Sequence, residues 1–257
     1  MNARAADLAP PLLFGLAVLA VWQVGVKLLG VPAIILPAPS AILLRLVTST
    51  PTLAADFLQT IRGVLAGYVI GSGAGLLVAI LVDRSPFLQR GLLPLGNFVS
   101  ALPIVGVAPI MVMWFGFDWQ SKAAVVVVMT FFPMLVNATV GLAGAGPMER
   151  DLMMTYAADY SQTLRMLRLP AAAPFVFNAL KINTTLAMIG AIVAEFFGTP
   201  TVGMGFRIST EVGHLSIDMV WATIFVAALT GSAFYALVAL IERRVTFWHA
   251  SYRMREN

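Results

Sequence analysis

Long apolar blocks constrain this chain more than any other feature. Stretches of about 20 mostly apolar residues, each able to cross a bilayer core roughly 30 Å thick, recur along the whole sequence. Of the 257 residues, 60% are hydrophobic and 11% are charged, whereas an ordinary soluble domain carries roughly 25% charged residues. Such a chain cannot fold entirely in water. The sequence therefore predicts an all-α, polytopic membrane protein that forms a single transmembrane domain over residues 1–257.

About six transmembrane helices are expected from the positions of these blocks. The first block contains Trp22 and Lys27 where an interfacial anchor would lie, and it is longer than the apolar part of a signal peptide, so it is interpreted as a retained helix. A proline-containing loop over residues 31–56 follows, with one short amphipathic helix near residues 41–47. The expected spans cover about Pro11–Leu29, Leu58–Val82, Leu92–Phe115, Lys122–Leu142, Ala171–Phe197 and Met219–Ile241.

The positions of Lys and Arg predict which helix ends face the cytoplasm. Cytoplasmic loops carry an excess of both residues, and an even number of spans puts both chain ends on one side. With both ends cytoplasmic, Arg62 and Lys181 fall within spans. The outer side then holds Lys27, Arg45, Lys122 and Arg207, and the cytoplasmic side holds Arg4, Arg84, Arg90, Arg150, Arg165, Arg168, Arg243, Arg244, Arg253 and Arg255. We therefore predict a multi-pass membrane protein with both termini in the cytoplasm.

The chain lacks the residues that several classes of function require. The chain has no cysteine, and His214 and His249 are too few and too far apart for a histidine metal cage. The arginines are scattered and form no basic run of the kind that binds nucleic acid. Ser72 stands in a Gly-Ser-Gly sequence, but no histidine and no pair of carboxylates lies within a span, which argues against a membrane-embedded enzyme. We expect no catalytic residue, metal site or cofactor in this chain and no nucleic-acid partner.

Two prolines and one charged stripe mark candidate positions on a translocation pathway. Pro103 and Pro109 leave carbonyls without helical partners in the third block, and such breaks are tolerated mainly beside protein or a water-lined cavity. A simple kink that improves packing is the alternative. In the fifth block, one helix face carries Lys181, Thr185, Met188, Ile192 and Glu195. That face either lines a pathway or packs against another helix with its charge satisfied.

Small and polar residues elsewhere in the spans are expected to hold helices together. One face of the second span carries a glycine at every fourth position, namely Gly67, Gly71 and Gly75. Another helix can approach that face closely. Arg62 lies near the outer end of the same span, where a snorkelling anchor is favoured over an anion site. Asn183 and Thr184 point away from the charged stripe and are expected to bond neighbouring helices.

The segment over residues 143–170 differs in kind from the spans. It mixes charged residues with apolar ones in an amphipathic pattern, which predicts a helical hairpin on or below the cytoplasmic membrane surface. One interpretation is an interfacial helix that packs on lipid headgroups. The other is a docking surface for a cytoplasmic partner.

A specific resemblance favours the docking surface. The sequence from Asp151 to Ala157, followed by nine residues and then Leu-Arg-Leu-Pro up to Pro170, resembles the EAA loop of ABC importer permeases. In that pattern Glu-Ala-Ala, three residues and Gly are followed by nine residues, Ile, any residue and Leu-Pro. Leu and Met stand here for the two alanines, alanine for the glycine and leucine for the isoleucine. The residues that the resemblance assigns to coupling with an ATPase are Asp151, Tyr156, Ala157, Ala158, Leu167, Leu169 and Pro170.

Motifs outside the loop extend the resemblance over residues 36–241. The sequences from Thr60 to Gly75 and from Ala101 to Gly116 are similar to the second and third spans of permeases that serve alkanesulfonate, taurine, nitrate and pyrimidine-precursor importers. Phe131-Phe-Pro, Ala194-Glu and Gly203-Met-Gly follow in the expected order. The chain is thus identified as a member of the type I ABC importer permeases, which implies a MetI-like fold.

The resemblance also implies partners and a location. It implies a second permease copy, two cytoplasmic ATPases that bind ATP and Mg, a periplasmic binding protein and the bacterial inner membrane. The chain itself has no Gly-x-x-x-x-Gly-Lys-Ser/Thr phosphate loop, so ATP hydrolysis is assigned to the partner. A heteroaromatic vitamin or pyrimidine precursor is the favoured substrate, with sulfonate, nitrate or bicarbonate as alternatives. A stand-alone secondary carrier, the alternative from another class, would require inverted repeats and mid-depth carboxylates, neither of which is found.

Overall fold

The computed structural model describes residues 3–100, 102–198 and 201–247, and all regular secondary structure within them is helical. The prediction of an all-α fold is therefore confirmed. Ala101, His249, Arg253 and Arg255, which were used in the sequence argument, lie outside the described residues. The elements in chain order are α1 (Ala3–Leu28), α2 (Pro39–Thr48), α3 (Thr50–Arg84), α4 (Pro86–Ser100), α5 (Ile104–Phe115), α6 (Trp119–Ala143), α7 (Pro147–Thr155), α8 (Tyr160–Thr163), the π-helical turn η1 (Leu164–Arg168), α9 (Leu169–Phe197), α10 (Met204–Gly213) and α11 (Ile217–Val245).

Within this part of the chain, 5 helices are long and apolar enough to cross a membrane. They are α1, α3, α6, the continuous helix from Tyr160 to Phe197, and α11. The third span, expected over about Leu92–Phe115 with interruptions at its prolines, is divided into α4 and α5, and neither helix has the length of a span. Pro103 separates the two helices, since proline disfavours helical backbone at the residue before it. Pro94 and Pro109 lie inside α4 and α5 without ending them.

The second span begins earlier than the sequence argument placed it. α3 starts at Thr50 rather than near Leu58, and it is 35 residues long. Pro51 occupies its first turn, where the missing N–H has no helical partner to lose. The short amphipathic helix expected near residues 41–47 is confirmed as α2.

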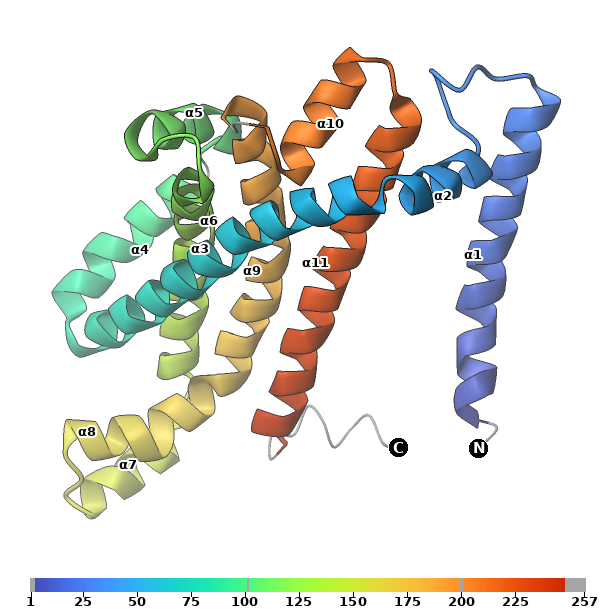
Figure 1. Cartoon of the computed structure of the whole chain (residues 1–257). Helices are drawn as coiled ribbons and strands as arrows, with labels where there is room; N and C mark the ends of the chain where they lie inside the picture. The colour runs from blue at the N-terminus through green and yellow to red at the C-terminus, as the bar shows by residue number, and fades with distance from the viewer. Residues whose placement is uncertain (1–2, 101, 199–200, 248–257) are drawn as a thin grey trace.

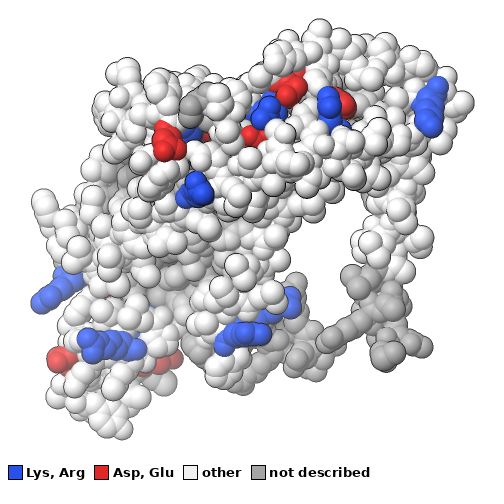
Figure 2. Space-filling model, in the orientation of Figure 1, with Lys and Arg blue, Asp and Glu red and all other residues white. Residues whose placement is uncertain are grey.

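The helix ends sort into two groups at opposite ends of the molecule (Figure 1). α1 begins and α11 ends toward the lower end of the view, where α7 and α8 also lie, whereas α2, α5 and α10 lie at the upper end. On the face shown in Figure 2, the charged side chains gather in an upper and a lower band with uncharged surface between them. This arrangement is typical of a protein that crosses a membrane.

Three of the long helices, α3, α6 and α9, pack into a tight unit. A Cβ atom added at Gly67 would lie 2.5 Å from Val126 Cβ, and one added at Gly75 would lie 2.9 Å from Met134 Cβ. One added at Gly71 would lie 2.8 Å from the carbonyl oxygen of Val127. Side chains cannot be accommodated at such distances, so α6 approaches α3 because these positions are glycine. The predicted role of the glycine stripe is confirmed.

Polar groups join the same three helices. The amide of Asn183 in α9 donates to Ser72 Oγ of α3 at 2.9 Å and to the carbonyl of Thr130 in α6 at 2.8 Å. The prediction for Asn183 is thus confirmed. The prediction for Thr184 is wrong, because its hydroxyl donates to the carbonyl of Lys181 in its own helix.

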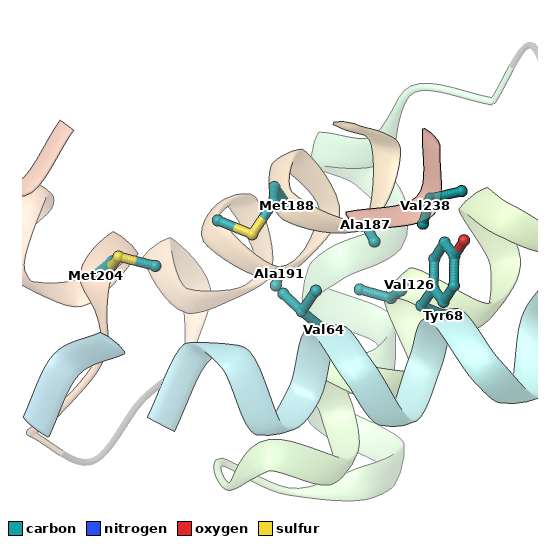
Figure 3. Close-up of a cluster of buried hydrophobic side chains, with 8 residues drawn as sticks. All are labelled: Val64, Tyr68, Val126, Ala187, Met188, Ala191, Met204 and Val238. Carbon is teal, nitrogen blue, oxygen red and sulfur yellow. The ribbon is translucent and has the colours of Figure 1, made fainter. Parts of the chain in front are cut away.

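Apolar side chains fill the space where five helices meet (Figure 3). The cluster receives side chains from α3, α6, α9, α10 and α11, and all of its members are buried. Its members are Val64, Tyr68, Val126, Ala187, Met188, Ala191, Met204 and Val238. The Tyr68 hydroxyl donates to the carbonyl of Leu180 at 3.1 Å, so the polar end of the only tyrosine in the cluster is satisfied.

Candidate coupling segment and translocation face

The segment predicted to couple to an ATPase forms a helical hairpin at the lower end of the molecule (Figure 1). α7 supplies the first arm, residues 156–159 the turn, and α8 the start of the second arm. None of the nine residues of α7, all of which the structure describes, is buried. Tyr156 is 74% exposed although it is aromatic. An exposed apolar surface outside the spans is typical of an interaction site or of contact with lipid headgroups.

The turn after α7 explains one departure from the family pattern. Ala157 stands where the pattern has glycine, and its φ is 51°. The N–H of Ala157 donates to Met154 O at 2.9 Å and the N–H of Ala158 to Met153 O at 3.0 Å, which together form a Schellman motif. The position after the helix end in this motif adopts left-handed backbone, which glycine tolerates best. The backbone conformation therefore accounts for the glycine of the family pattern, and Ala157 adopts the same conformation with a Cβ atom.

The expected turn at Leu169-Pro170 is absent. Leu169 is helical, with φ −64° and ψ −45°, and the helix continues from Tyr160 to Phe197. Pro170 lies in the first turn of α9, directly after the π-helical turn, whose wider ring is closed by the N–H of Leu169 and the carbonyl of Leu164. The seven residues predicted to couple to an ATPase therefore lie in two different places. Asp151 to Ala158 lie on α7 and its turn, whereas Leu167, Leu169 and Pro170 lie half-buried at the base of the long helix.

The predicted stripe on α9 faces two shallow grooves toward α11. Lys181 and Thr185 line a groove of 350 Å³ with Asn178 and Tyr235. Thr185 and Met188 line a groove of 450 Å³ that α11 closes on the other side. Asn178 and Thr185 are exposed on a membrane-spanning helix. Polar groups at this depth require cover from protein or water.

The charge of Lys181 is satisfied within the chain. Its Nζ lies 2.7 Å from Glu242 Oε2, and the two side chains are 21% and 9% exposed. Glu242 lies in the last turns of α11, one residue beyond the span predicted from the sequence, and for that reason the sequence argument did not pair it with Lys181. The ion pair links α9 to α11 toward the end of the molecule that carries α7.

Glu195, the outermost member of the predicted stripe, faces away from these grooves. It is 2% exposed and accepts hydrogen bonds from Thr60 Oγ1 at 2.8 Å and from the N–H of Gly205 at 2.7 Å. Gly203 lies so close that an added Cβ would stand 2.7 Å from Glu195 Oε1. The carboxylate thus ties α9 to α3 and to the start of α10.

The sequence argument did not identify a second buried carboxylate, Asp56, at the end of the molecule where Glu195 lies. Asp56 is fully buried and accepts from Arg207 Nε at 2.8 Å and from the N–H of Gly203 at 2.9 Å. The hydrogen bond to Asp56 raises the pKa of Arg207 above its usual value, so the guanidinium stays charged. The four-residue spacing of Asp56 and Thr60, which puts both on one face of α3, was the available signal. It was missed because Asp56 was assigned to a loop.

Lys122 and Asp118 fix the start of α6. Lys122 was assigned to the outer surface but is 1% exposed, and its Nζ donates to the carbonyls of Phe117 and Gly198. Asp118 caps the helix by accepting from the N–H of Trp119 at 2.8 Å. The hydrogen bond from Gln59, with that of the cap, lowers the pKa of Asp118. Arg62 is exposed, in keeping with a surface anchor.

The two prolines proposed for the pathway lie apart from the α9 stripe. Pro103 precedes α5 and Pro109 lies within it, and both are exposed. α5 packs its buried Ala108 against Val125 and Ala194, near the start of α6 and the end of α9. The structure therefore does not bring Pro103 and Pro109 together with Lys181, Thr185 and Met188.

Comparisons with known proteins agree with this architecture. Residues 67–247 match the family described as binding-protein-dependent transport system inner membrane component. The chain is 29% identical over 239 residues to the formylaminopyrimidine transport permease protein ThiX of Halalkalibacterium halodurans, covering 93% of this chain and 95% of the relative. It is 30% identical over 232 residues to the riboflavin transport system permease protein RibX of Chloroflexus aurantiacus, covering 90% and 86%.

A third relative and one solved structure complete the comparison. The chain is 29% identical over 244 residues to the putative aliphatic sulfonates transport permease protein SsuC of Bacillus subtilis, covering 94% and 88%. A crystal structure of an amino acid ABC transporter with histidines has the same fold, with a TM-score of 0.61 at 16% identity over 78% of this chain and 97% of the other. The chain therefore belongs to the binding-protein-dependent transport system inner membrane components, the permeases of ABC importers.

Proposed function

We propose that two copies of this chain form the translocation pathway of an ATP-driven importer in the bacterial inner membrane. Two separate ATPases, which bind ATP and Mg, dock on α7 and its turn, and a periplasmic binding protein delivers the substrate at the opposite end. Both chain ends face the cytoplasm in this arrangement. The membrane nature and family of the chain support this assignment, and the names of the relatives describe transport permeases.

One observation carries the proposal most directly. A single continuous helix runs from Tyr160, beside the exposed hairpin, to Phe197 at the far end of the molecule. Its exposed face presents Asn178 and Thr185 within the membrane-spanning part. A polar face that the chain leaves uncovered is expected to meet a second copy across a water-filled path. The same helix thus joins the surface offered to an ATPase with the surface offered to a solute.

The side chains that line the groove of Lys181 and Tyr235, between α9 and α11, support a neutral heteroaromatic substrate. Lys181 is the only cation among the residues that line this groove, and Glu242 neutralises it at 2.7 Å. The remaining polar groups are the amide of Asn178 and the hydroxyls of Thr185 and Tyr235. These groups hydrogen-bond a neutral ring or stack on it, whereas a permanently anionic sulfonate would be better served by an unpaired cation. Two relatives have names that state formylaminopyrimidine and riboflavin transport.

Co-purification tests the docking surface. Tyr156→Asp adds a charge to the exposed turn without altering a buried contact, so the variant should insert normally and lose its partner ATPase. Gln89→Asp places the same charge at an exposed position of α4 and should retain the ATPase. Equal retention by both variants would favour an interfacial helix over a docking surface.

Uptake into proteoliposomes tests the pathway and the substrate. Vesicles that contain permease, ATPase and the neighbouring binding protein should accumulate a labelled hydroxymethyl- or formyl-aminopyrimidine with ATP, and excess taurine should not compete. Competition by taurine would instead assign the sulfonate class. Reporter fusions at residue 150 should give a cytoplasmic signal and fusions at residue 207 an outer signal, and the reverse pattern would contradict the proposed orientation.

A further inference from the structure

A cluster of charged and aromatic side chains joins the coupling hairpin to the lower end of α3. Asp83 Oδ2 accepts from Arg168 Nη1 at 2.5 Å and from the Tyr160 hydroxyl at 3.1 Å. The guanidinium carbon of Arg84 lies 5.4 Å from the centre of the Tyr160 ring, and that of Arg168 lies 5.9 Å from it. We call Asp83, Arg84, Tyr160 and Arg168 the base cluster. Tyr160 and Arg168 stand at positions that the family pattern leaves unspecified, and Asp83 and Arg84 lie outside the pattern.

The Asp83–Arg168 pair of the base cluster is shielded although it lies outside the core. The side chain of Asp83 is 9% exposed and that of Arg168 is 23% exposed. A bond between charged partners that water reaches poorly is stronger than a surface ion pair. The contact therefore holds the second arm of the hairpin to α3 at one defined place.

The π-helical turn gives the cluster its geometry. Tyr160 and Arg168 are eight positions apart. In a regular α-helix, the directions of their side chains around the helix axis would differ by about 80°. The π turn at Leu164–Arg168 absorbs one extra residue. The rotation between the two residues then equals that of seven α-helical residues. Their side-chain directions around the helix axis therefore differ by only about 20°. Both can then reach the same carboxylate, which a regular helix would not allow.

Pro170 supplies a reason for the π turn. In a regular helix its ring would collide with the carbonyl of Met166, and that carbonyl would lose its hydrogen-bond donor. The wider turn directly before the proline relieves both problems. The Leu-Pro sequence thus acts through helix register, although it does not end the helix.

We propose that Arg168 and Asp83 are positioning residues for energy coupling. Through their contact, movement of the hairpin is passed to α3 as well as to α9. α3 packs against α6 along its glycine stripe, so a displacement applied at its base moves the tightly packed helices together. Without the contact, the hairpin moves α9 alone and pivots at the π turn. This inference rests on the proposed coupling of the hairpin to an ATPase.

The first test uses the permease alone. The chain has no cysteine, so two introduced cysteines are the only labelling sites. Spin labels at Ser161→Cys and Gln89→Cys, both exposed, should give one narrow distance distribution between the two labels of one chain, measured in nanodiscs with labelled permease diluted by unlabelled permease. Arg168→Gln and Pro170→Ala should each broaden it, whereas Arg90→Gln, an exposed arginine at the same end, should not. An unchanged distribution in Arg168→Gln would overturn the proposal.

The second test uses the complex with ATPase and binding protein. Arg168→Gln and Asp83→Asn should retain the ATPase but lower its stimulation by the loaded binding protein about fivefold or more, the lower range of coupling between sites. The exchange of charges in Asp83→Arg with Arg168→Asp should restore part of it. Unchanged stimulation, even with a lower melting temperature, would overturn the positioning role. If the wild type itself fails to retain the ATPase, the proposed function fails and the distance measurement alone decides the base cluster.

Discussion

The three central helices and the two outer ones are similarly apolar but are used differently. In the apolar stretches of α3, α6 and α9, 39%, 44% and 39% of the residues are buried inside the protein. In those of α1 and α11, only 6% of the residues are buried. The central helices place Gly67, Ser72 and Asn183 at their contacts. In a bilayer, apolar area alone does not bring helices together, so small residues and internal hydrogen bonds decide which ones pack. Hydropathy therefore identifies the spans, and the small polar residues identify the core.

The outer helices attach at a few points. α1 meets the rest through Gln23, whose side chain donates to Ser40 Oγ at 3.1 Å, and through Trp22, whose ring lies 5.1 Å from that of Trp221. α11 contributes Val238 to the central apolar cluster and is held further by the Lys181–Glu242 ion pair and by Arg45 of α2, which lies 3.1 Å from Asp218. Loss of one polar attachment should therefore loosen an outer helix without unfolding the centre.

The largest expected effect comes from filling the glycine stripe. Gly71→Leu places a side chain where even a Cβ would lie 2.8 Å from the carbonyl oxygen of Val127, so α6 must move away. The loss of stability should lie at or above the upper end of the roughly 1–3 kcal/mol that overpacking costs. Gly73→Leu, two positions along α3 with nothing within 4 Å, is the matched control. Heating followed by size-exclusion chromatography should show early aggregation of the first variant only.

Breaking the tie between the core and α11 should have the next largest effect. Lys181→Met leaves Glu242, whose side chain is 9% exposed, without its partner. Because Lys181 itself is partly exposed, the loss of stability should lie near about 2 kcal/mol, between the cost for a fully buried pair and that for an exposed one. The double variant with Glu242→Gln should be more stable than the single one, because no charge is left alone. If the single and double variants melt at the same temperature, the pair does not attach α11. Uptake by the double variant then measures whether Lys181 also contacts the solute.

A hydroxyl in the core should matter more than the same hydroxyl on α11. Thr60→Val removes the donor to Glu195 and the acceptor of the N–H of Met204, for an expected loss of about 1–2 kcal/mol. Thr230→Val in α11 removes only a bond to the carbonyl of Val226 in its own helix. The melting temperature of Thr230→Val should stay close to wild type. Equal shifts would contradict the distinction between the two groups of helices.

The sequence predicted the elements that follow from hydropathy and spacing. The five long helices, the glycine stripe and the bonding role of Asn183 all follow from local patterns. Partners that lie far apart in the chain did not, because pairs such as Lys181 with Glu242 depend on how the helices cross. The interruptions of the third span were predicted only in part, since Pro103 separates α4 from α5 whereas Pro94 and Pro109, judged equally disruptive, lie inside these helices.

The π turn lay beyond prediction from this pattern. The local sequence Leu169-Pro170 predicts a helix end, because proline disfavours helical backbone at the residue before it. The helix continues because the wider turn before Pro170 accommodates the ring, and because Leu164 and Leu169 pack against the buried cluster that includes Ala79 and Val82. Tertiary packing thus overrides the local preference.

The smallest expected effect tests whether the hairpin is independent of the core. Ala157→Gly removes the strain of left-handed backbone, about 1–2 kcal/mol, and loses part of the gain because glycine is freer in the unfolded chain, by about 0.4–1 kcal/mol. A net local gain of up to about 1.6 kcal/mol should appear as slower hydrogen exchange in α7 and its turn. Exchange in α3, α6 and α9 should not change, because α7 contributes no buried residue to them. Ala158→Gly, at a position without positive φ, should speed exchange in the same turn. Slower exchange throughout α3, α6 and α9 in Ala157→Gly would show that the hairpin and the core unfold as one unit, and the distinction between a rigid centre and a separately ordered coupling arm would then fail.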